Sequence, residues 1–146
     1  MRDISLLLKE KLGGKIKDIQ NPTKKRVYIT VDRGNIKECA KVIFRDLDAR
    51  YIIASGIENF DSFEILYHFG FDKEGVIVSI RTYLDKEKPE VESLTDIIPG
   101  ISYIEREMHE LLGINFAGHP DMKHFLLRDD WPVGNYPLRK GSNGKQ

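Results

Sequence analysis

A run of strict alternation, residues 62–71, is the feature that most constrains the fold of this chain. Its odd-numbered positions are all large apolar or aromatic residues, whereas the even-numbered positions include Glu64 and His68. Alternation with a period of two places one set of side chains on one face of a β-strand. A tight turn at residues 72–75 leads to residues 76–84, which carry a second apolar set with the same period. The sequence therefore predicts two antiparallel strands with one buried face.

The residues before this pair supply further helices and strands. Helices are predicted from apolar spacing over residues 3–12 and 36–47. Strands are predicted over residues 15–20, 26–31 and 50–57. Asn21-Pro22 marks a turn, and Asn35 with Glu38 resembles a capping pair for the second helix. The order helix, two strands, helix, three strands predicts a two-layer α+β fold, in which the helices lie on one face of a mixed or antiparallel sheet.

The composition of the chain changes after this scaffold. A short helix is expected at residues 102–112. Ser102 and Glu105 have the spacing of a capping box, and Gly113 can adopt the left-handed backbone conformation that ends a helix. The residues that follow are rich in Gly and Pro, yet they keep anchors such as Trp131 and Tyr136. We expect a single domain in which residues 1–100 form the α+β scaffold. Residues 101–146, the short helix plus an extended partner-binding tail, belong to the same structural domain.

The composition also argues against several functional classes. Basic and acidic residues both number 23, so the basic excess that general nucleic-acid binding requires is absent. Cys39 is the only cysteine, so no internal disulfide forms, and its place in an apolar stripe predicts a buried side chain. No apolar run approaches the roughly 20 residues of a membrane-spanning helix. Charged residues interrupt the apolar start of the chain, so we expect no signal peptide.

Ionisable side chains on the third helix suggest a metal site as one alternative. Glu105 and His109 are four residues apart on one helix face, and His119 or His124 could complete a divalent-metal site. The corresponding enzyme would use Glu105, His109, His119 and Asp121. The His-Glu-x-x-His zinc signature is absent, because Gly113 stands where the second histidine would fall. On this interpretation the chain is a stand-alone metal-dependent enzyme. On the other, these side chains form a polar stripe that faces solvent or a partner.

Other candidates for catalysis are weaker in pattern. His119 lies between Gly118 and the bend at Pro120, where a histidine can carry protons or wedge a loop onto a scaffold. Asp129 and Asp130 lie on a proline-bounded loop, which favours a capping or salt-bridge role over acid–base catalysis. The sequence has no phosphate-binding glycine loop and no Ser, Cys or Lys in an activating setting.

The C-terminal tail has the composition of a binding segment. Trp131, Tyr136 and Arg139 are of the residue types that carry most of the energy of protein interfaces. Its prolines restrict the unbound chain and so lower the entropy cost of ordering an extended segment. The tail is thus expected to lie against a surface, and that surface belongs either to another protein or to the chain's own sheet.

The signature of a known family is found in residues 105–140, which read EREMHELLGINFAGHPDMKHFLLRDDWPVGNYPLRK. This run resembles the 30 kDa subunit family of respiratory complex I, or NADH dehydrogenase. The matching groups are Glu105-Arg106-Glu107, Gly113-Ile114, Gly118-His119-Pro120-Asp121, Asp130-Trp131 and Pro137-Leu138-Arg139-Lys140. Residues 109–112 depart from the Tyr-Asp-Met-Phe of complex I members and look like the equivalent subunit of membrane-bound energy-converting NiFe hydrogenases. Asn135-Tyr136 replaces a second histidine of complex I members, which puts any role of that histidine in doubt.

The resemblance implies a specific set of partners. Members carry no cofactor and are not catalysts by themselves, although they belong to multisubunit oxidoreductases that couple electron transport to ion translocation. They dock on the large catalytic subunit of the peripheral arm, of the quinone-site or NiFe type, beside neighbouring iron–sulfur subunits. The implied location is cytoplasmic, peripheral on the inner face of the cell membrane. A hydrogenase-type or ferredoxin-linked complex is favoured over an NADH:quinone enzyme.

The third helix and the tail are together expected to form the partner contact. The residues expected there are Glu105, Arg106, Glu107, His119, Pro120, Asp121, Arg128, Asp130, Trp131, Tyr136, Pro137, Leu138, Arg139 and Lys140. No catalytic, cofactor-binding or metal-ligating residue is expected on this interpretation.

Overall fold

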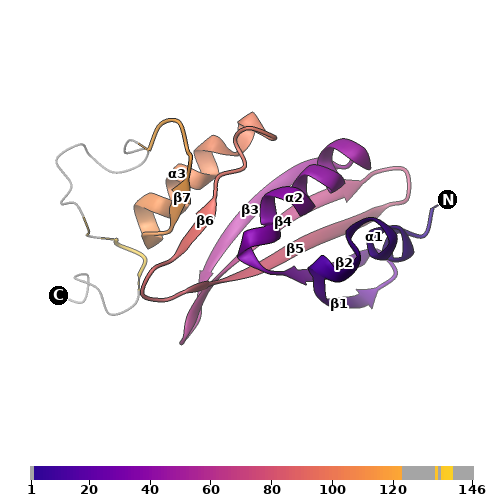
Figure 1. The fold of residues 1–146 in the computed structure, drawn as a ribbon, viewed down its shortest axis with the longest axis horizontal. Coiled ribbons are helices and arrows are strands. Elements are labelled where there is room, and N and C mark those ends of the chain that lie inside the picture. Colours follow the sequence, from indigo (N-terminus) through magenta and orange to yellow (C-terminus); the bar gives the residue numbers. More distant parts are fainter. Residues whose placement is uncertain (1, 123–133, 135, 140–146) are drawn as a thin grey trace.

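Five strands form the central sheet of the computed structural model, which describes residues 2–122, 134 and 136–139 (Figure 1). The strands are β1 (Ile16–Thr23), β2 (Arg26–Val31), β3 (Arg50–Glu58), β4 (Ser62–Phe71) and β5 (Val76–Asp85). Their order across the sheet is β1-β2-β5-β4-β3. Strands β2 and β5 are parallel, and the other neighbours are antiparallel. The sheet is therefore mixed, as the sequence predicted, and β1 and β3 are its two edges.

Strands β4 and β5 confirm the alternation seen in the sequence. Phe63 and Tyr67 of β4 are fully buried, and Phe63 pairs across the strands with the buried Leu84 of β5. The apolar side chains of one face are removed from water because the helices pack over that face. The buried side chains form one continuous core that extends along the chain from Ile4 to Phe116.

The turn predicted at Asn21-Pro22 is wrong. Both residues belong to β1, and the chain turns instead at Lys24-Lys25. Pro22 is tolerated there because β1 is an edge strand, on which a missing N–H need not cost a ladder bond. The pairing of β1 with β2 also shifts register around this proline.

Two helices cover the buried face of the sheet (Figure 1). They are α1 (Ile4–Leu12) and α2 (Ile36–Lys41), and α2 continues as a π-helix (Val42–Asp46). Asp3 caps α1, since its carboxylate accepts a hydrogen bond from the backbone N–H of Leu6 at 3.1 Å. The capping pair predicted for α2 does not form. Asn35 makes no side-chain cap, and Glu38 instead pairs with Lys15 at 3.2 Å.

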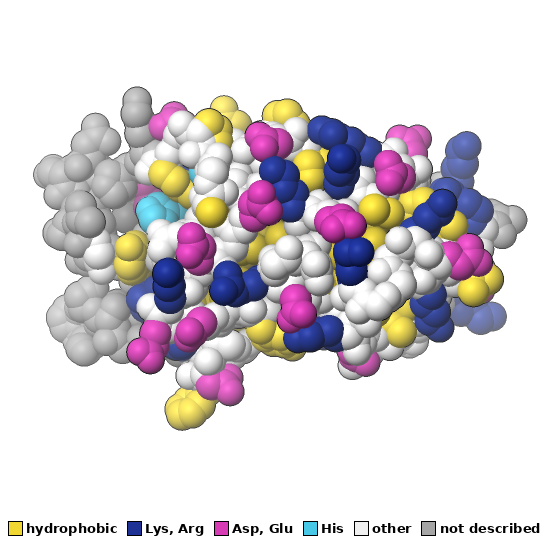
Figure 2. Space-filling view, viewed as in Figure 1, with side chains coloured by type: hydrophobic (Ala, Val, Ile, Leu, Met, Phe, Trp, Pro, Cys, Tyr) yellow, Lys and Arg dark blue, Asp and Glu magenta, His cyan; other side chains and the backbone are white. Residues whose placement is uncertain are grey.

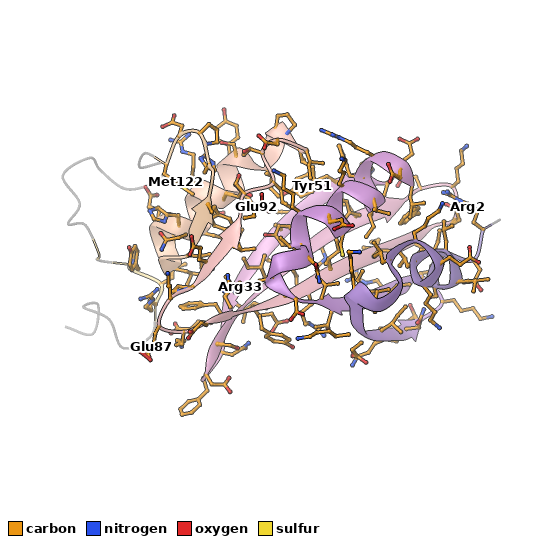
Figure 3. The ribbon with its side chains drawn as sticks, viewed as in Figure 1. Arg2, Arg33, Tyr51, Glu87, Glu92 and Met122 are labelled. Carbon is orange, nitrogen blue, oxygen red and sulfur yellow. The ribbon has the colours of Figure 1, made fainter. Side chains whose placement is uncertain are left out.

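The chain after β5 forms a smaller unit beside the edge strand β3. Glu87 lies in the loop that leads out of β5 (Figure 3). The elements that follow are β6 (Glu90–Glu92), a 3-10 turn (Pro99–Ile101), α3 (Ser102–Leu112) and β7 (Asn115–Ala117). Strands β6 and β7 pair in parallel as a separate two-stranded sheet, which the sequence did not predict because such short strands carry almost no periodicity. Gly56 lets α3 approach β3, since a Cβ there would lie 3.0 Å from Met108 Sδ.

The second face of the main sheet is not covered by a helix within the described part of the chain, and it carries polar and aromatic side chains. Arg81 Nε donates to Glu64 at 2.9 Å, and its guanidinium carbon lies 5.3 Å from the centre of the Tyr28 ring. Ile53 and Tyr83 are each 48% exposed. This face therefore combines a charge-paired centre with scattered apolar side chains.

Basic and acidic side chains are interspersed on the face of the molecule drawn in Figure 2. Neither sign gathers there into a large patch, in line with the equal numbers of basic and acidic residues. Among the residues that the structure describes, no helix combines the length and the apolar character needed to cross a membrane.

Candidate partner interface

Helix α3 begins differently from the sequence expectation. It follows the turn Pro99–Ile101, and no side chain caps its first residues. The predicted capping box of Ser102 and Glu105 is therefore wrong. The Ser102 hydroxyl lies 3.2 Å from His119 Nε2, and the Glu105 carboxylate points into the protein. The predicted end is confirmed, because Gly113 adopts a left-handed conformation with φ of 80°.

Glu105 is fully buried between α3 and the segment that follows β6. Its Oε1 accepts a hydrogen bond from the Ser93 hydroxyl at 2.7 Å, and its Oε2 accepts one from the backbone N–H of Leu94 at 2.8 Å. Burial raises the pKa of Glu105 to about 7, although both hydrogen bonds act to lower it. Because a buried carboxylate is costly without such donors, these contacts tie α3 to the segment after β6.

His119 fastens the loop after β7 onto the same helix. Its Nδ1 accepts a hydrogen bond from the backbone N–H of Asp121 at 3.0 Å, so the neutral ring carries its proton on Nε2. Nε2 lies 3.3 Å from the Ser102 carbonyl oxygen and 3.9 Å from Glu105 Oε1. The side chains of His119 and Glu105 are both fully buried. This arrangement corresponds to the wedge role, one of the two that the turn predicted for His119.

The described tail residues lie against the C-terminal end of α3. The backbone N–H of Leu138 donates to the Leu111 carbonyl, and Arg139 Nε donates to the Leu112 carbonyl, each at 3.0 Å. The last carbonyls of a helix lack partners within the helix, so the tail satisfies two of them. The Arg139 guanidinium carbon also lies 5.0 Å from the centre of the Phe63 ring in β4.

Gly113 allows this close approach of the tail. A Cβ at this position would lie 2.6 Å from Arg139 Nη2 and 2.6 Å from the Tyr136 ring. Tyr136 in turn packs edge-on against His109, with ring centres 6.3 Å apart. Gly113 thus ends the helix and also provides the surface on which the tail lies. The sequence predicted only the first of these roles.

The predicted contact residues divide by burial. Glu105 and the His119 ring point inward, and Arg139 is half-buried against Phe63. The other described members keep part of their surface exposed: Arg106, Glu107, Pro120, Asp121, Tyr136, Pro137 and Leu138. Outside the described residues lie Arg128, Asp130, Trp131 and Lys140. Ser93 and Phe63 complete the arrangement, but they were not predicted as site residues because only tertiary contacts connect them to Glu105 and Arg139.

The described residues of the alternative metal site are not arranged to hold a metal ion, and His124 lies outside the described residues. Glu105 is engaged by donors from the segment after β6, and His109 Nδ1 donates to the Ile114 carbonyl at 3.0 Å. His119 Nδ1 accepts from the backbone of Asp121 and is not free to face a metal. Within residues 2–122, 134 and 136–139, no group of three His, Cys, Asp or Glu side chains is placed to hold a metal ion.

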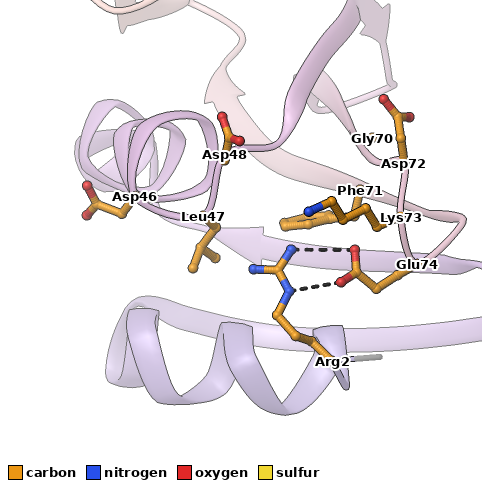
Figure 4. A pocket seen from close by; sticks show the side chains of 9 residues that line it. All are labelled: Arg2, Asp46, Leu47, Asp48, Gly70, Phe71, Asp72, Lys73 and Glu74. Atoms are coloured by element: carbon orange, nitrogen blue, oxygen red, sulfur yellow. Dashed lines mark hydrogen bonds and ion pairs between the residues drawn. The ribbon is translucent and has the colours of Figure 1, made fainter.

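A pocket of about 410 Å³ at the N-terminal end of the molecule is bridged by its own side chains (Figure 4). Arg2 Nε donates to Glu74 at 2.9 Å, and the guanidinium carbon lies 5.6 Å from the centre of the Phe71 ring. These contacts link the start of the chain to the turn between β4 and β5. Arg2 and Glu74 are therefore paired with each other at this end of the molecule, away from α3 and the tail.

The family of this chain follows from its similarity to known proteins. Residues 29–146 match the family described as Respiratory-chain NADH dehydrogenase, 30 Kd subunit. The chain belongs to this family. The resemblance found in residues 105–140 is thereby confirmed.

Relatives in this family come from several kinds of complex. The chain is 32% identical over 129 residues to the C subunit of F(420)H(2) dehydrogenase from Methanosarcina mazei, covering 86% of this chain and 80% of that protein. It is 35% identical over 126 residues to the beta subunit of membrane-bound hydrogenase from Pyrococcus furiosus, covering 83% and 72%. It is also 53% identical over 68 residues to the C/D subunit of NADH-quinone oxidoreductase from Phocaeicola vulgatus. That match covers 47% of this chain but only 12% of the longer protein.

Two solved structures share the fold. The first, from the membrane-bound sulfane sulfur reductase (MBS), an archaeal respiratory membrane complex, has a TM-score of 0.78 over 94% of this chain and 82% of that chain. The second, a trypsin-resistant fragment of Nqo5, has a TM-score of 0.67 over 82% of this chain and 99% of the fragment. Sequence identities of 21% and 22% limit these likenesses to the fold. They confirm the predicted α+β architecture.

Proposed function

We propose that this protein is a cofactor-free accessory subunit of a complex I-like, membrane-associated oxidoreductase. It docks on the large catalytic subunit of the peripheral arm, of the quinone-site or NiFe type, beside iron–sulfur subunits on the cytoplasmic face of the membrane. The single observation that carries the proposal is the family match over residues 29–146. Relatives named as subunits of NADH-quinone oxidoreductase, F(420)H(2) dehydrogenase and a membrane-bound hydrogenase support the class of assembly.

The geometry of α3 supports an assembly role over a catalytic one. Three described side chains here that could perform acid–base chemistry are used in contacts within the chain: Glu105 accepts from Ser93, His119 accepts from the Asp121 N–H, and His109 donates to the Ile114 carbonyl. A catalytic carboxylate needs access to a substrate, whereas Glu105 is fully buried. What this region offers to solvent is one side of a short helix and a docked tail.

The large subunit is proposed as the direct partner because some relatives carry the names of two subunits on one protein. Proteins of Phocaeicola vulgatus and Bacteroides thetaiotaomicron carry the joint designation C/D, and this chain covers only 12% and 15% of them. A name that joins two subunits, on a protein much longer than this chain, supports a C-type domain followed by a D-type domain in one polypeptide. Domains joined in this way stay close in space, so we take the D-type subunit as the neighbour of this chain.

The kind of complex is proposed from residues 109–112. His-Glu-Leu-Leu at these positions is the hydrogenase-like form of the motif. This form supports a hydrogenase-type or ferredoxin-linked complex over an NADH:quinone enzyme. Identity does not separate the two kinds, since it is 35% over 126 residues to the hydrogenase subunit of Pyrococcus furiosus and 53% over 68 residues to the C/D subunit of NADH-quinone oxidoreductase from Phocaeicola vulgatus.

Co-purification tests the proposal. The chain is co-expressed with the large subunit of its own complex, and recovery of that subunit on the tagged chain is measured. We expect wild type and Arg2→Ala, which lies at the far end of the molecule, to recover it equally. The double variant Trp131→Ala/Arg139→Ala is expected to recover much less, because two interface anchors are lost. Failure of the wild-type chain to bind the large subunit would overturn the proposal. Full recovery of the large subunit by the double variant would show that the tail is not part of the contact.

A further inference from the structure

Strand β3 is the edge of the sheet that lies beside α3. Within the described part of the chain it pairs with β4 on one side and with no strand on the other. It is nine residues long, and its charges stand only at the ends, Arg50 and Glu58. Proteins usually protect an exposed edge with proline or with charges along the strand, because unpaired main-chain groups there template another strand. The middle of β3, residues 51–57, has neither proline nor charge.

An apolar groove of about 330 Å³ follows this edge. It is lined by residues 53–56 of β3, by the side of α3 that includes Leu111, and by Leu138 of the tail. Leu138 is 62% exposed and Ile53 is 48% exposed, so the groove presents apolar surface to solvent. Among the described residues that line it, Glu107 is the one with an ionisable side chain.

We propose that this groove receives an extended segment of the large D-type subunit, which adds a strand to the outer edge of β3. The inference rests on the proposed function and identifies the contact within it. Hydrogen bonds between the two main chains give affinity, and alternate side chains of the added strand enter the space between β3 and α3. The lining calls for apolar side chains at those positions and for a basic one beside Glu107.

The course of the tail argues for this occupant. Leu138 lines the groove, its backbone N–H is bonded to the Leu111 carbonyl, and Arg139 follows on the end of α3. Residues 138 and 139 of the tail therefore run beside the groove. On the proposed arrangement, in which a D-type domain follows a C-type domain in one polypeptide, the chain that leads to the D-type domain leaves the C-type fold by way of this tail. We therefore place a segment of the D-type subunit at the neighbouring edge of β3.

Two lysine substitutions with equal starting exposure test the contact. Ile53→Lys places a charge at the outer edge of the sheet, where Ile53 lines the groove from the uncovered face. Tyr83→Lys places one on the same face but on β5, inside the sheet, where the wild-type side chain is also 48% exposed. Affinity for the purified large subunit is measured for both. We expect Ile53→Lys to weaken binding about tenfold or more, since one apolar contact is replaced by a charge that loses water on binding. Tyr83→Lys is expected to stay within about twofold of wild type, as for substitutions outside an interface.

Amide hydrogen exchange in the assembled complex gives a readout specific to strand addition. Added main-chain hydrogen bonds slow the exchange of β3 amides when the large subunit binds. The other edge strand, β1, is the internal control and is expected to exchange at an unchanged rate. Protection of β3 without protection of β1 supports the proposal, as does the loss of that protection in Ile53→Lys.

The possible outcomes separate this inference from the proposed function. If the wild-type chain does not bind the large subunit, the proposed function is overturned together with the inference. If it binds while Ile53→Lys binds equally well and β3 stays unprotected, only the edge contact is overturned. If the isolated chain is a dimer that Ile53→Lys dissociates, a second copy of this chain covers the edge, and the proposal for the D-type subunit is also overturned.

Discussion

In the β4–β5 hairpin, Phe69 and Val78 are buried among apolar side chains, whereas α3 buries the carboxylate of Glu105 against two hydrogen-bond donors. Apolar burial is non-directional, so the hairpin needs only the right side chains on the right face. A buried carboxylate needs donors at fixed positions, so α3 depends on Ser93 and Leu94 standing where they do. The hairpin is thus stabilised by buried apolar area, whereas α3 combines the apolar packing of Met108 and Leu112 with a few directed contacts. The second region is also the one beside which we place the partner.

The largest expected effect would come from a cavity in the hairpin. Phe69→Ala should lower the free energy of unfolding by about 3–5 kcal/mol, since Phe69 is fully buried. Tyr83→Ala on the neighbouring strand removes a half-exposed ring and should cost less than about 1 kcal/mol. Urea denaturation measures both values. A cost below about 1 kcal/mol for Phe69→Ala would break the comparison, because the hairpin would then not be held by apolar burial.

The next effect concerns the charge of Glu105. Burial raises its pKa from 4.5 to about 7, so the folded protein binds this proton more tightly than the unfolded chain does. The stability that this group contributes is fully present below about pH 4.5 and is lost as the pH rises through about 7. A shift of this size corresponds to roughly 3 kcal/mol.

The measurement compares Glu105→Gln with wild type. Glutamine keeps an acceptor for the Leu94 N–H but does not titrate, so the wild type should lose stability relative to the variant between about pH 5 and pH 8. Burial lowers the pKa of His68, whose effect runs in the opposite direction, but His68 is present in both proteins and cancels in the difference. Parallel stability profiles of the two proteins across this range would mean that Glu105 is not desolvated as the structure indicates.

A smaller effect on stability is expected from alanine at Gly113, where the tail lies against the end of α3. Gly113 and Gly75 both have positive φ, at 80° and 67°, so alanine at either position should cost about 1–2 kcal/mol of backbone strain. A Cβ at Gly75 has no atom within 4 Å, whereas a Cβ at Gly113 would meet Arg139 and Tyr136 at 2.6 Å. Gly113→Ala should therefore displace the tail and cost more than Gly75→Ala in thermal unfolding. Equal costs would show that the tail does not contribute to the stability of the isolated chain.

Local pattern accounts for most of the scaffold. The period-two alternation of residues 62–71 predicted β4 with its bounds, because burial of one face of a strand leaves a direct trace in the sequence. Helix α3 and its stop at Gly113 were also predicted, from apolar spacing and from the conformational freedom of glycine. Predictions were wrong where a tertiary contact replaced the structure that a local motif predicts. Asn21-Pro22 lies in an edge strand and not in a turn. Glu105 accepts hydrogen bonds from Ser93 and Leu94 and does not form a capping box.

The sequence identified the residues of the family motif but not how they are arranged in the fold. The motif of residues 105–140 identified the family, and the partner contact that it implies stays a prediction. Nothing in the motif indicated that the Glu105 and His119 side chains are buried together, or that Arg139 lies over Phe63. These pairs are far apart along the chain, and each residue type has many other uses in proteins.

The sequence by itself determined the strands of the hairpin, the helices and the family, because these depend on side-chain periodicity and on a contiguous motif. Only the tertiary structure decided which groups satisfy the buried carboxylate of Glu105, how the tail closes the end of α3, and which strand edge lies open beside a groove. The physical reason is that hydrogen bonds and close contacts between distant segments need positions accurate to a fraction of an ångström. Such positions are a property of the packed whole and leave no periodic trace in the chain.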